Sequence, residues 1–305
     1  MMHIEGVAIE DTFAEAFGMR ATRLVITAAS RAWARHAAVT ATGFATSVIG
    51  CGCEAAIERD LAPRETPDGR PGVAVLLFAM STKELQKQVE RRTGQCVLPC
   101  ATTAAYGGIA ADAVHEWLGL GRSLRYFGDG FQISKLIDGR RYWRIPVMDG
   151  EFVCEDRIGL VKGIGGGNFL ILARDAAAAL AAAERAVAAM RRVRNVILPF
   201  PGGVVRSGSK VGSKYRTLPA STNDAYCPTL RGLVRTRLPA GAEAVLEIVI
   251  DGLDAASIRL AMGAGIRAAC ERGAERGVAA ISAGNYGGKL GPHHFHLRQI
   301  MSAPA

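Results

Sequence analysis

The sequence alternates short strand-forming runs with helical stretches that begin at a capping residue, and this pattern occurs four times. Ser30, Ser81 and Asp254 each stand directly before a stretch whose apolar residues recur at helical spacing. Side chains of these types accept a hydrogen bond from the first turn of a helix. Since each helix lies between two strand-like runs, the sequence predicts four β-α-β units, two in each half of the chain. The strands expected in these units are residues 4–9, 23–28, 46–49, 73–78, 96–98, 168–172, 195–198, 245–250 and 278–282.

Four such units predict an α+β fold, with two tightly associated lobes of split β-α-β type and similar topology. We expect one lobe at residues 1–150 and the other at residues 151–305, each with helices on one face of a mostly antiparallel sheet. The elements expected outside this pattern are a helical turn opened by residues 11–13, a helix at 103–117, a hairpin of 142–147 with 151–153, and an edge strand at 291–297. Leu180, Ala183, Val187 and Met190 are expected to form the buried face of the alanine-rich helix 175–192.

Composition limits where the protein can work. The chain has 305 residues, of which 49% are hydrophobic, enough for a sizeable core. Apolar runs such as residues 72–80 are far shorter than the roughly 20 residues that span a bilayer, and the N-terminus lacks the pattern of a signal peptide. Seven cysteines with no regular spacing are typical of a reducing compartment. We therefore expect a cytoplasmic protein.

One polar stretch, residues 199–228, interrupts the regular pattern. It contains four glycines, which let the backbone pass close to a ligand. Lys210 and Lys214 can bind anions. Loops of this length in a compact domain are usually functional or disordered, and the apolar residues of the loop favour order. A plain surface loop remains the alternative.

The formal net charge is +9. A basic chain of this kind can be merely soluble, or it can bind nucleic acid, an acidic protein or a polyanionic small molecule. The arginines are scattered and no stripe of basic and aromatic residues occurs, so nucleic-acid binding is the less favoured alternative.

The sequence does not match three familiar motifs, namely the phosphate loop, the dinucleotide-binding fingerprint and the ligand spacing of zinc sites. Residues 203–210 place Gly-Ser-Lys where a phosphate loop needs Gly-Lys-Ser/Thr before a helix. The glycines at 163–167 precede a strand and not a helix, unlike a dinucleotide fingerprint. Cys51 and Cys53 are too close together for zinc, and the histidines near residue 294 are more consistent with a polar edge. The sequence predicts no metal site.

Glu247 is the most informative single residue. It interrupts the apolar strand VLEIVI, both of whose faces are hydrophobic. Burial of a carboxyl group raises its pKa and favours the protonated form. We expect a partly desolvated carboxyl group. From spacing alone, a structural carboxylate paired with an arginine is nearly as good an interpretation.

Several motifs resemble one family, the formylmethanofuran–tetrahydromethanopterin formyltransferases. The matching motifs span nearly the whole chain in the family's order, and the longer ones are highly specific. They are EDTFAEAF (10–17), ITAAS (26–30), ATGFATSVI (41–49), TPDGRPG (66–72), FGDG (127–130), GGNF (166–169), PFPGG (199–203), SKVGSK (209–214), LPASTNDAYCPT (218–229), EIVI around Glu247, and ISAGNYGGKLG (281–291).

The resemblance implies two ferredoxin-like lobes in a homotetramer. It implies an acyltransferase that moves a formyl group from N-formylmethanofuran to N5 of tetrahydromethanopterin, with no metal or bound cofactor. The strand glutamate of the family matches Glu247, which is the candidate catalytic residue. The net charge departs from that of the strongly acidic archaeal members of salt-rich cells. It therefore suggests a bacterial relative that works in one-carbon oxidation with hydrolase-type subunits of a larger complex.

The chemistry suggests roles for the polar residues in the matching motifs. An amine must attack a formamide carbon, so an oxyanion forms and an amine must leave. Backbone N–H groups at glycine-rich turns can stabilise the oxyanion, and a protonated Glu247 can donate a proton. We expect direct transfer without a covalent enzyme intermediate, because no base is evident beside Cys227. The candidate substrate-binding residues are Asp11, Thr12, Lys210, Lys214, Ser221, Thr222, Asn223, Asp224, Tyr226, Asn285 and Lys289.

Two other classes of function stay open at the level of sequence. One is a catalytically inactive scaffold subunit of a formyltransferase/hydrolase complex, against which the intact Glu247 argues. The other is a basic nucleic-acid-binding protein, whose affinity would fall steeply with salt.

Overall fold

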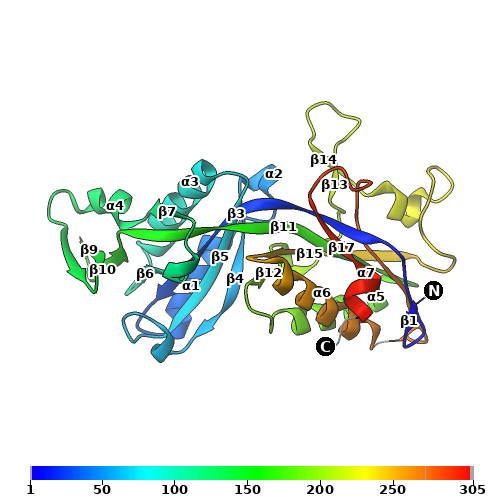
Figure 1. Ribbon diagram of the computed structural model, residues 1–305, viewed down its shortest axis with the longest axis horizontal. Helices are drawn as coiled ribbons and strands as arrows, with labels where there is room; N and C mark the ends of the chain where they lie inside the picture. Colours follow the sequence, from blue (N-terminus) through cyan, green and yellow to red (C-terminus); the bar gives the residue numbers. More distant parts are fainter. Residues whose placement is uncertain (1, 272, 303–305) are drawn as a thin grey trace. The chain divides into compact units, whose positions relative to one another are not determined.

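The structure is a computed structural model that describes residues 2–271 and 273–302 (Figure 1). The chain folds into two compact units. One, here called the terminal unit, consists of Met1–Gly18 and Ile164–Ala305, and the other, the inserted unit, consists of Met19–Gly163. The boundaries fall within the long strands β3 (Phe13–Thr27) and β11 (Arg157–Ala173), so each of these strands contributes to both units. The division predicted at residue 150 stays a prediction.

In the inserted unit, a sheet has the strand order β4-β5-β3-β6-β10-β9-β8. All pairs are antiparallel except β6 with β10. Helices α1 and α3 pack on one face of this sheet, against the alternate apolar residues of β3 and β5. The elements of this unit are α1 (Arg31–Thr42), α2 (Val48–Cys51), β4 (Glu54–Leu61), β5 (Gly72–Ala79), α3 (Thr82–Arg92), β6 (Ala104–Gly107), β7 (Glu116–Gly119), α4 (Gly121–Leu124), β8 (Ile133–Ile137), β9 (Arg140–Val147) and β10 (Gly150–Glu155), with short helical turns η1 (Pro63–Glu65), η2 (Thr93–Val97), η3 (Ala111–Ala113) and η4 (Arg125–Gly128).

In the terminal unit, the sheet order is β1-β2-β16-β11-β15-β12, antiparallel except for β2 with β16. Strand β17 pairs with the first residues of β3. The elements of this unit are β1 (Met2–Ile4), β2 (Val7–Ile9), α5 (Ala176–Met190), β12 (Val196–Ile197), η5 (Pro201–Gly203), β13 (Lys210–Val211), β14 (Ala220–Ser221), η6 (Asp224–Tyr226), η7 (Pro228–Leu230), β15 (Ala244–Gly252), α6 (Ala255–Cys270), β16 (Val278–Ser282), β17 (His293–His296) and α7 (Leu297–Ser302).

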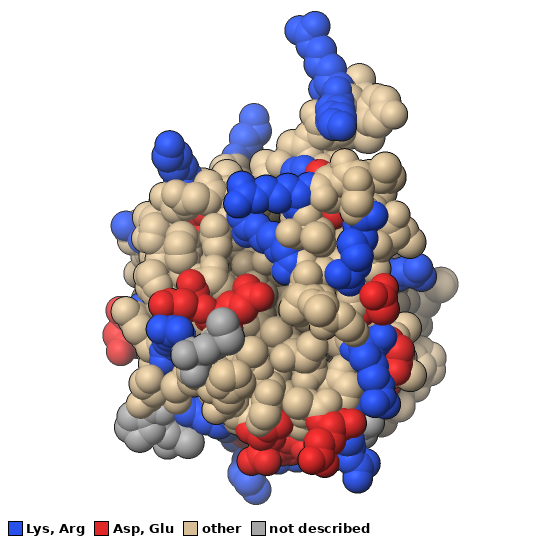
Figure 2. All heavy atoms as spheres, turned by 90° about the vertical axis from the view of Figure 1, so that its right-hand side faces the viewer, with Lys and Arg blue, Asp and Glu red and all other residues tan. Residues whose placement is uncertain are grey.

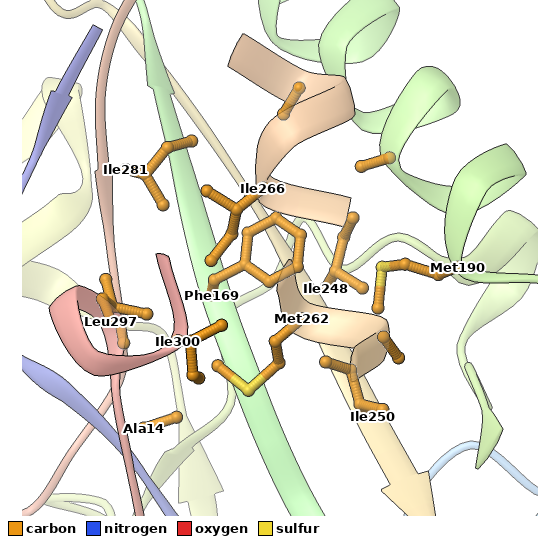
Figure 3. Packing of buried hydrophobic residues seen from close by; sticks show 14 of the residues in the cluster. Ala14, Phe169, Met190, Ile248, Ile250, Met262, Ile266, Ile281, Leu297 and Ile300 are labelled. Atoms are coloured by element: carbon orange, nitrogen blue, oxygen red, sulfur yellow. The ribbon is translucent and has the colours of Figure 1, made fainter. Parts of the chain in front are cut away.

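The two faces of the sheet in the terminal unit have different covers. Helices α5 and α6 lie below the strands in Figure 1, and the segment that carries β13 and β14 lies above them. Phe169 of β11 projects into the helical side, among Ile248 of β15 and Met262 and Ile266 of α6 (Figure 3). On the other face, the neighbouring Leu170 packs with Tyr226 of the long loop. The long loop that the sequence predicts at residues 199–228 is therefore ordered, and it covers one face of this sheet.

The predicted helix starts are confirmed by the hydrogen bonds of the capping residues. The side chains of Ser30, Ser81, Asp175 and Asp254 accept backbone N–H groups of Trp33, Glu84, Ala178 and Ser257, respectively. The α+β class and the hairpin of β9 with β10 are likewise confirmed. These features follow from residues close in sequence.

Several local predictions are wrong. Residues 11–13 do not open a helical turn, because β3 begins at Phe13 and pairs with β17. Residues 46–49 lead into α2, which Ser47 caps and Gly52 ends at a φ of 77°, so the chain returns as a strand only in β4. Residues 96–98 do not form a strand either, since the N–H of Leu98 closes a π-helical turn on Thr93.

Two further corrections concern helices. Residues 103–117 contain strands β6 and β7 in place of the predicted helix, since β6 pairs with β3 and β10, two strands remote in sequence. Pairing of this kind overrides the weak local preferences of alanine. Leu180 is 48% exposed, because small alanines such as Ala179 and Ala186 form the buried face of α5 instead.

Candidate active site

Glu247 lies in the middle of β15, directly opposite Leu170 of β11. Directly opposite residues on paired strands share a face, so Glu247 faces the long loop and not the helical core. Its side chain is 3% exposed. The buried carboxyl group predicted from the apolar strand is therefore confirmed, and the arginine partner considered as an alternative does not appear among the ion pairs of the described residues.

The two carboxyl oxygens of Glu247 have different surroundings. Oε1 accepts a 2.6 Å hydrogen bond from Oγ of Ser209, whereas Oε2 is buried without a hydrogen-bond partner in the described part of the chain. Burial raises the pKa of Glu247, and the Ser209 hydrogen bond opposes this shift in part. An unsatisfied buried oxygen is costly as a charge and less so as a neutral acid. The geometry thus favours a protonated carboxyl group with one proton available to a ligand.

A cavity of about 40 Å³ opens beside this carboxyl group. That space is enough for a water molecule or for a group of similar size. Its wall contains Glu247 and three other candidates from the sequence, Thr222, Asn223 and Tyr226. The remaining lining residues are Leu170, Val205, Arg206, Ser207, Gly208, Cys227 and Val245.

Gly208 brings two parts of the long loop together at this cavity. Its φ is 76°, which side-chain-bearing residues rarely adopt. A Cβ at this position would lie 2.7 Å from the backbone N of Asn223. Only glycine fits both the conformation and the close approach.

A chain of hydrogen-bonding side chains extends from the cavity along the sheet face that carries Glu247. Leu170 stands opposite both Glu247 and Ser282, on its two neighbouring strands. Oγ of Ser282 lies 3.1 Å from the hydroxyl of Tyr226 and donates a 2.5 Å hydrogen bond to Glu10. Ser282 and Glu10 were not singled out from the sequence as site residues, although both stand in motifs that carry the family resemblance.

A second network approaches Glu247 through Ser209. The hydroxyl of Tyr286 donates to the carbonyl oxygen of Ser209 at 2.6 Å and accepts from the N–H of Val211 at 3.2 Å. Burial raises the pKa of Tyr286, so its hydroxyl keeps its proton at neutral pH. Sequence reasoning missed Ser209 and Tyr286 as site residues, and their place in the motifs SKVGSK and ISAGNYGGKLG was the signal available.

The other candidate residues fall into four groups. Lys210 is paired with Asp224 at 2.9 Å, and this hydrogen bond lowers the pKa of the carboxyl group of Asp224. The side chain of Asn285 donates to Thr12 at 3.0 Å. Three candidates are exposed. They are Lys214, Lys289 and Asp11, and Asp11 pairs with Arg298. Ser221 donates to the carbonyl oxygen of Gly212, which supports the loop itself.

The long loop, residues 199–228, and the segment that follows it are strongly basic. Between residues 199 and 243 the sequence has seven Lys or Arg residues against two Asp or Glu residues. In Figure 2, Lys and Arg side chains gather on the upper part of the face, and most Asp and Glu side chains lie lower. A surface of this kind attracts anionic ligands.

The histidines near the end of the chain lie on β17. The ring of Phe13 lies 4.8 Å from the ring of His294 and 5.1 Å from that of His296, so these two imidazoles pack against an aromatic side chain. Among the described residues, no group of three His, Cys, Asp or Glu side chains is placed to hold a metal ion. None of the helices in the described ranges has the length and hydrophobicity needed to cross a membrane.

The chain is similar to known proteins over nearly its whole length. A family model described as formylmethanofuran-tetrahydromethanopterin formyltransferase matches residues 2–147, and one described as its proximal lobe matches residues 150–300. The formylmethanofuran–tetrahydromethanopterin formyltransferase of Methylococcus capsulatus is 66% identical over 301 residues, which cover 99% of this chain and 100% of that protein.

Two solved structures are similar over almost the whole chain. The first is the formyltransferase/hydrolase complex of Methylorubrum extorquens with methylofuran, in which one chain has a TM-score of 0.95 and 51% identity and the match covers 99% of both chains. The second is the formyltransferase of Methanosarcina barkeri, with a TM-score of 0.90 and 47% identity over 98% of this chain and 100% of that one.

These similarities define an enzyme class, the formyltransferases. The chain belongs to the formylmethanofuran–tetrahydromethanopterin formyltransferase family. The predicted activity, transfer of a formyl group between formylmethanofuran and tetrahydromethanopterin as substrates, is thereby confirmed. The resemblance to a bacterial relative is confirmed as well.

Proposed function

We propose that Glu247 is the general acid of formyl transfer in this chain. The observation that carries the proposal is a buried carboxyl group with a raised pKa, one oxygen of which lacks a partner among the described residues, beside a cavity of about 40 Å³. This space suits a formyl group and is too small for a furan or pterin ring, so the remainder of each substrate lies outside it. The reacting carbon would thus be the part held next to Glu247.

The chemistry follows from the bonds that change. The N5 amine of tetrahydromethanopterin attacks the formyl carbon of N-formylmethanofuran, and the carbonyl oxygen becomes an oxyanion. Glu247 donates its proton to the departing methanofuran nitrogen as that C–N bond breaks. The carboxylate then takes the proton released by N5, which regenerates the acid. General acid–base catalysis of this kind contributes about 10²–10⁴ in rate.

The oxyanion needs hydrogen-bond donors that are fixed in advance. The backbone N–H groups of Ser207 and Gly208 are our candidates, since both residues line the cavity at a turn where only glycine fits. Removal of such a donor typically costs about 10²–10³ in turnover. The transfer needs no covalent enzyme intermediate, and Cys227 hydrogen-bonds to the carbonyl oxygen of Asn223 instead of to a base.

The basic loop would bind the acidic ends of the substrates. Lys214 and Lys289 are exposed and suit this role directly. Lys210 is already paired with Asp224, so it would either exchange that partner for a substrate anion or orient Asp224. Thr222, Asn223 and Tyr226 would contact the substrate at the cavity. Asn285, Thr12, Asp11 and Ser221 would shape the walls of the binding site.

We also propose that the protein is a homotetramer and that it associates with hydrolase-type subunits. Exposed aromatic and apolar side chains of the inserted unit, such as Phe127, Phe131 and Met148, support an interface. The similar chain of Methylorubrum extorquens belongs to a formyltransferase/hydrolase complex. A monomer in light scattering at micromolar concentration would contradict the tetramer.

Two finer points complete the proposal. We expect both lobes, divided near residue 150, to have the ferredoxin-like topology. We also expect a cytoplasmic location, which the seven free thiols support.

The direct test is an assay with purified protein, N-formylmethanofuran and tetrahydromethanopterin. Formation of the formylated pterin is followed for the native chain and for Glu247→Gln over a range of pH. A native chain that forms product, and a variant that forms it far more slowly, would support the assignment. A variant with native turnover would refute it.

A further inference from the structure

Glu15 is a second buried carboxylate, and the proposed chemistry does not use it. It lies on β3 and is 2% exposed. Its two oxygens accept four backbone N–H groups from one loop more than 270 residues away in sequence. The donors are Tyr286 at 2.7 Å and Gly288 at 3.0 Å to Oε2, and Leu290 and Gly291, the latter at 2.9 Å, to Oε1.

This arrangement keeps the carboxyl group charged. Burial alone would raise the pKa of Glu15, but the four N–H donors outweigh burial and lower the pKa. Hydrogen bonds from neutral donors to a charged acceptor are among the stronger ones in proteins. Glu15 therefore holds the loop tightly without a cationic partner among the described ion pairs.

The loop is rich in glycine, and its first residues are also held by Asn285, which donates to Thr12 and to the carbonyl oxygen of Phe13. Residues 284–291 read GNYGGKLG, and Gly287 and Gly288 adopt φ values of 75° and 74°. A Cβ on Gly291 would lie 2.1 Å from the carbonyl oxygen of Ala16, so the backbone of the loop is in close contact with the backbone of β3. A glycine-rich segment of this kind loses much conformational entropy on ordering. The carboxylate of Glu15 offsets that loss.

The loop at residues 284–291 is also hydrogen-bonded to the candidate active site. Tyr286 gives its N–H to Glu15 and its hydroxyl to the carbonyl oxygen of Ser209. Ser209 donates to Glu247 through its own side chain. A continuous path of three hydrogen bonds and two residues thus joins the two buried glutamates.

We propose that Glu15 is a positioning residue for formyl transfer, which acts through Tyr286 and Ser209 to hold Glu247 in its reactive orientation. This inference rests on the proposed role of Glu247. It differs from a general stabilising role because the path passes through one tyrosine hydroxyl, and that hydroxyl can be removed without touching Glu15.

The test uses the full chain and four variants. Glu15→Gln keeps the size of the side chain but places an NH₂ group against N–H donors. Tyr286→Phe removes the hydroxyl alone, and the third variant combines the two. Asp254→Ala serves as the control, because it removes the N-cap of α6 in the same unit and has no contact with the path.

We expect each single variant on the path to lower kcat by about 10- to 100-fold, the effect of small misplacements, with KM within about twofold. The double variant should lose no more than the stronger single variant, because both act through one path. Asp254→Ala should lower the melting temperature and keep kcat. A Glu15→Gln variant with native kcat, or a double variant whose losses multiply, would overturn the inference.

A measurement without substrate separates this inference from the role of Glu247. The N–H of Val211 bonds to the hydroxyl of Tyr286, so its hydrogen exchange reports on the path. Glu15→Gln and Tyr286→Phe should both speed exchange at Val211. Unchanged exchange at Val211 in Glu15→Gln would refute the coupling, whereas native turnover of Glu247→Gln would refute the acid role alone.

Discussion

Oγ of Ser209 donates a 2.6 Å hydrogen bond to Oε1 of Glu247, and the two residues lie 38 positions apart in sequence. The bond satisfies one carboxyl oxygen and orients the other, which has no partner in the described part of the chain, in the wall of the cavity. The serine therefore determines which oxygen of the acid remains available to the substrate.

Replacing Glu247 with Gln should lower turnover by roughly 10²–10⁴ with little change in KM, because the amide cannot transfer a proton. Steady-state kinetics with both substrates provides the measurement. Glu155→Gln is the matched control, since Glu155 is also a buried carboxyl group with a raised pKa but lies in the inserted unit. If Glu247→Gln turned over normally while Glu247→Ala lost thermal stability, Glu247 would be structural.

Ser209→Ala should shift the pH dependence of the reaction. The Ser209 hydrogen bond lowers the pKa of Glu247, so its loss raises that pKa further. Since the protonated form is the active acid, the alkaline limb of the pH profile of kcat/KM should move to higher pH. A limb that moved to lower pH, or stayed in place, would argue against Glu247 as the group that titrates.

Glu247 should also reduce the stability of the native chain as the pH rises. Its folded-state pKa lies above the ordinary value of 4.5, so the folded chain binds more protons than the unfolded chain between that value and the raised pKa. The free energy of unfolding therefore falls as pH rises through this window. Glu247→Gln cannot ionise, so it removes this fall in the free energy of unfolding. The difference in melting temperature between the variant and the native chain should therefore favour the variant more near pH 8 than near pH 4. The opposite trend in calorimetry would mean that the buried carboxyl group is ionised.

Lys214→Ala and Lys210→Ala should each raise KM more than they lower kcat. A remote ionic contact mainly supplies binding that is equal in the ground state and the transition state. The effect should shrink as ionic strength rises. Lys135→Ala, an exposed lysine on β8 in the inserted unit, is the control. Native KM values for both loop variants would show that these lysines are solvated surface residues with no role in substrate binding.

Gly208→Ala should cost more activity than Gly212→Ala. Both glycines have positive φ values, 76° and 85°, so both substitutions carry similar backbone strain. Only the alanine at 208 would also collide with Asn223, whereas a Cβ at 212 meets nothing within 4 Å. Equal turnover of the two variants would show that the close approach at Gly208 is irrelevant to the site.

The sequence by itself determined the features that depend on near neighbours. The caps of α1, α3 and α6, the hairpin of β9 with β10 and the strand around Glu247 follow from residues a few positions apart. The burial of Glu247 followed from two apolar faces on one short strand. The activity followed from motifs that match a family along almost the whole chain.

Only the tertiary structure decided the features that depend on distant partners. The fifteen residues of β3 form one strand because β5, β6 and β17 pair with it, and no local signal predicts that length. The path from Glu15 through Tyr286 to Ser209 joins residues 271 and 77 positions apart. Local spacing carries no information about such contacts, because they form only when the sheet and its loops close around Glu247.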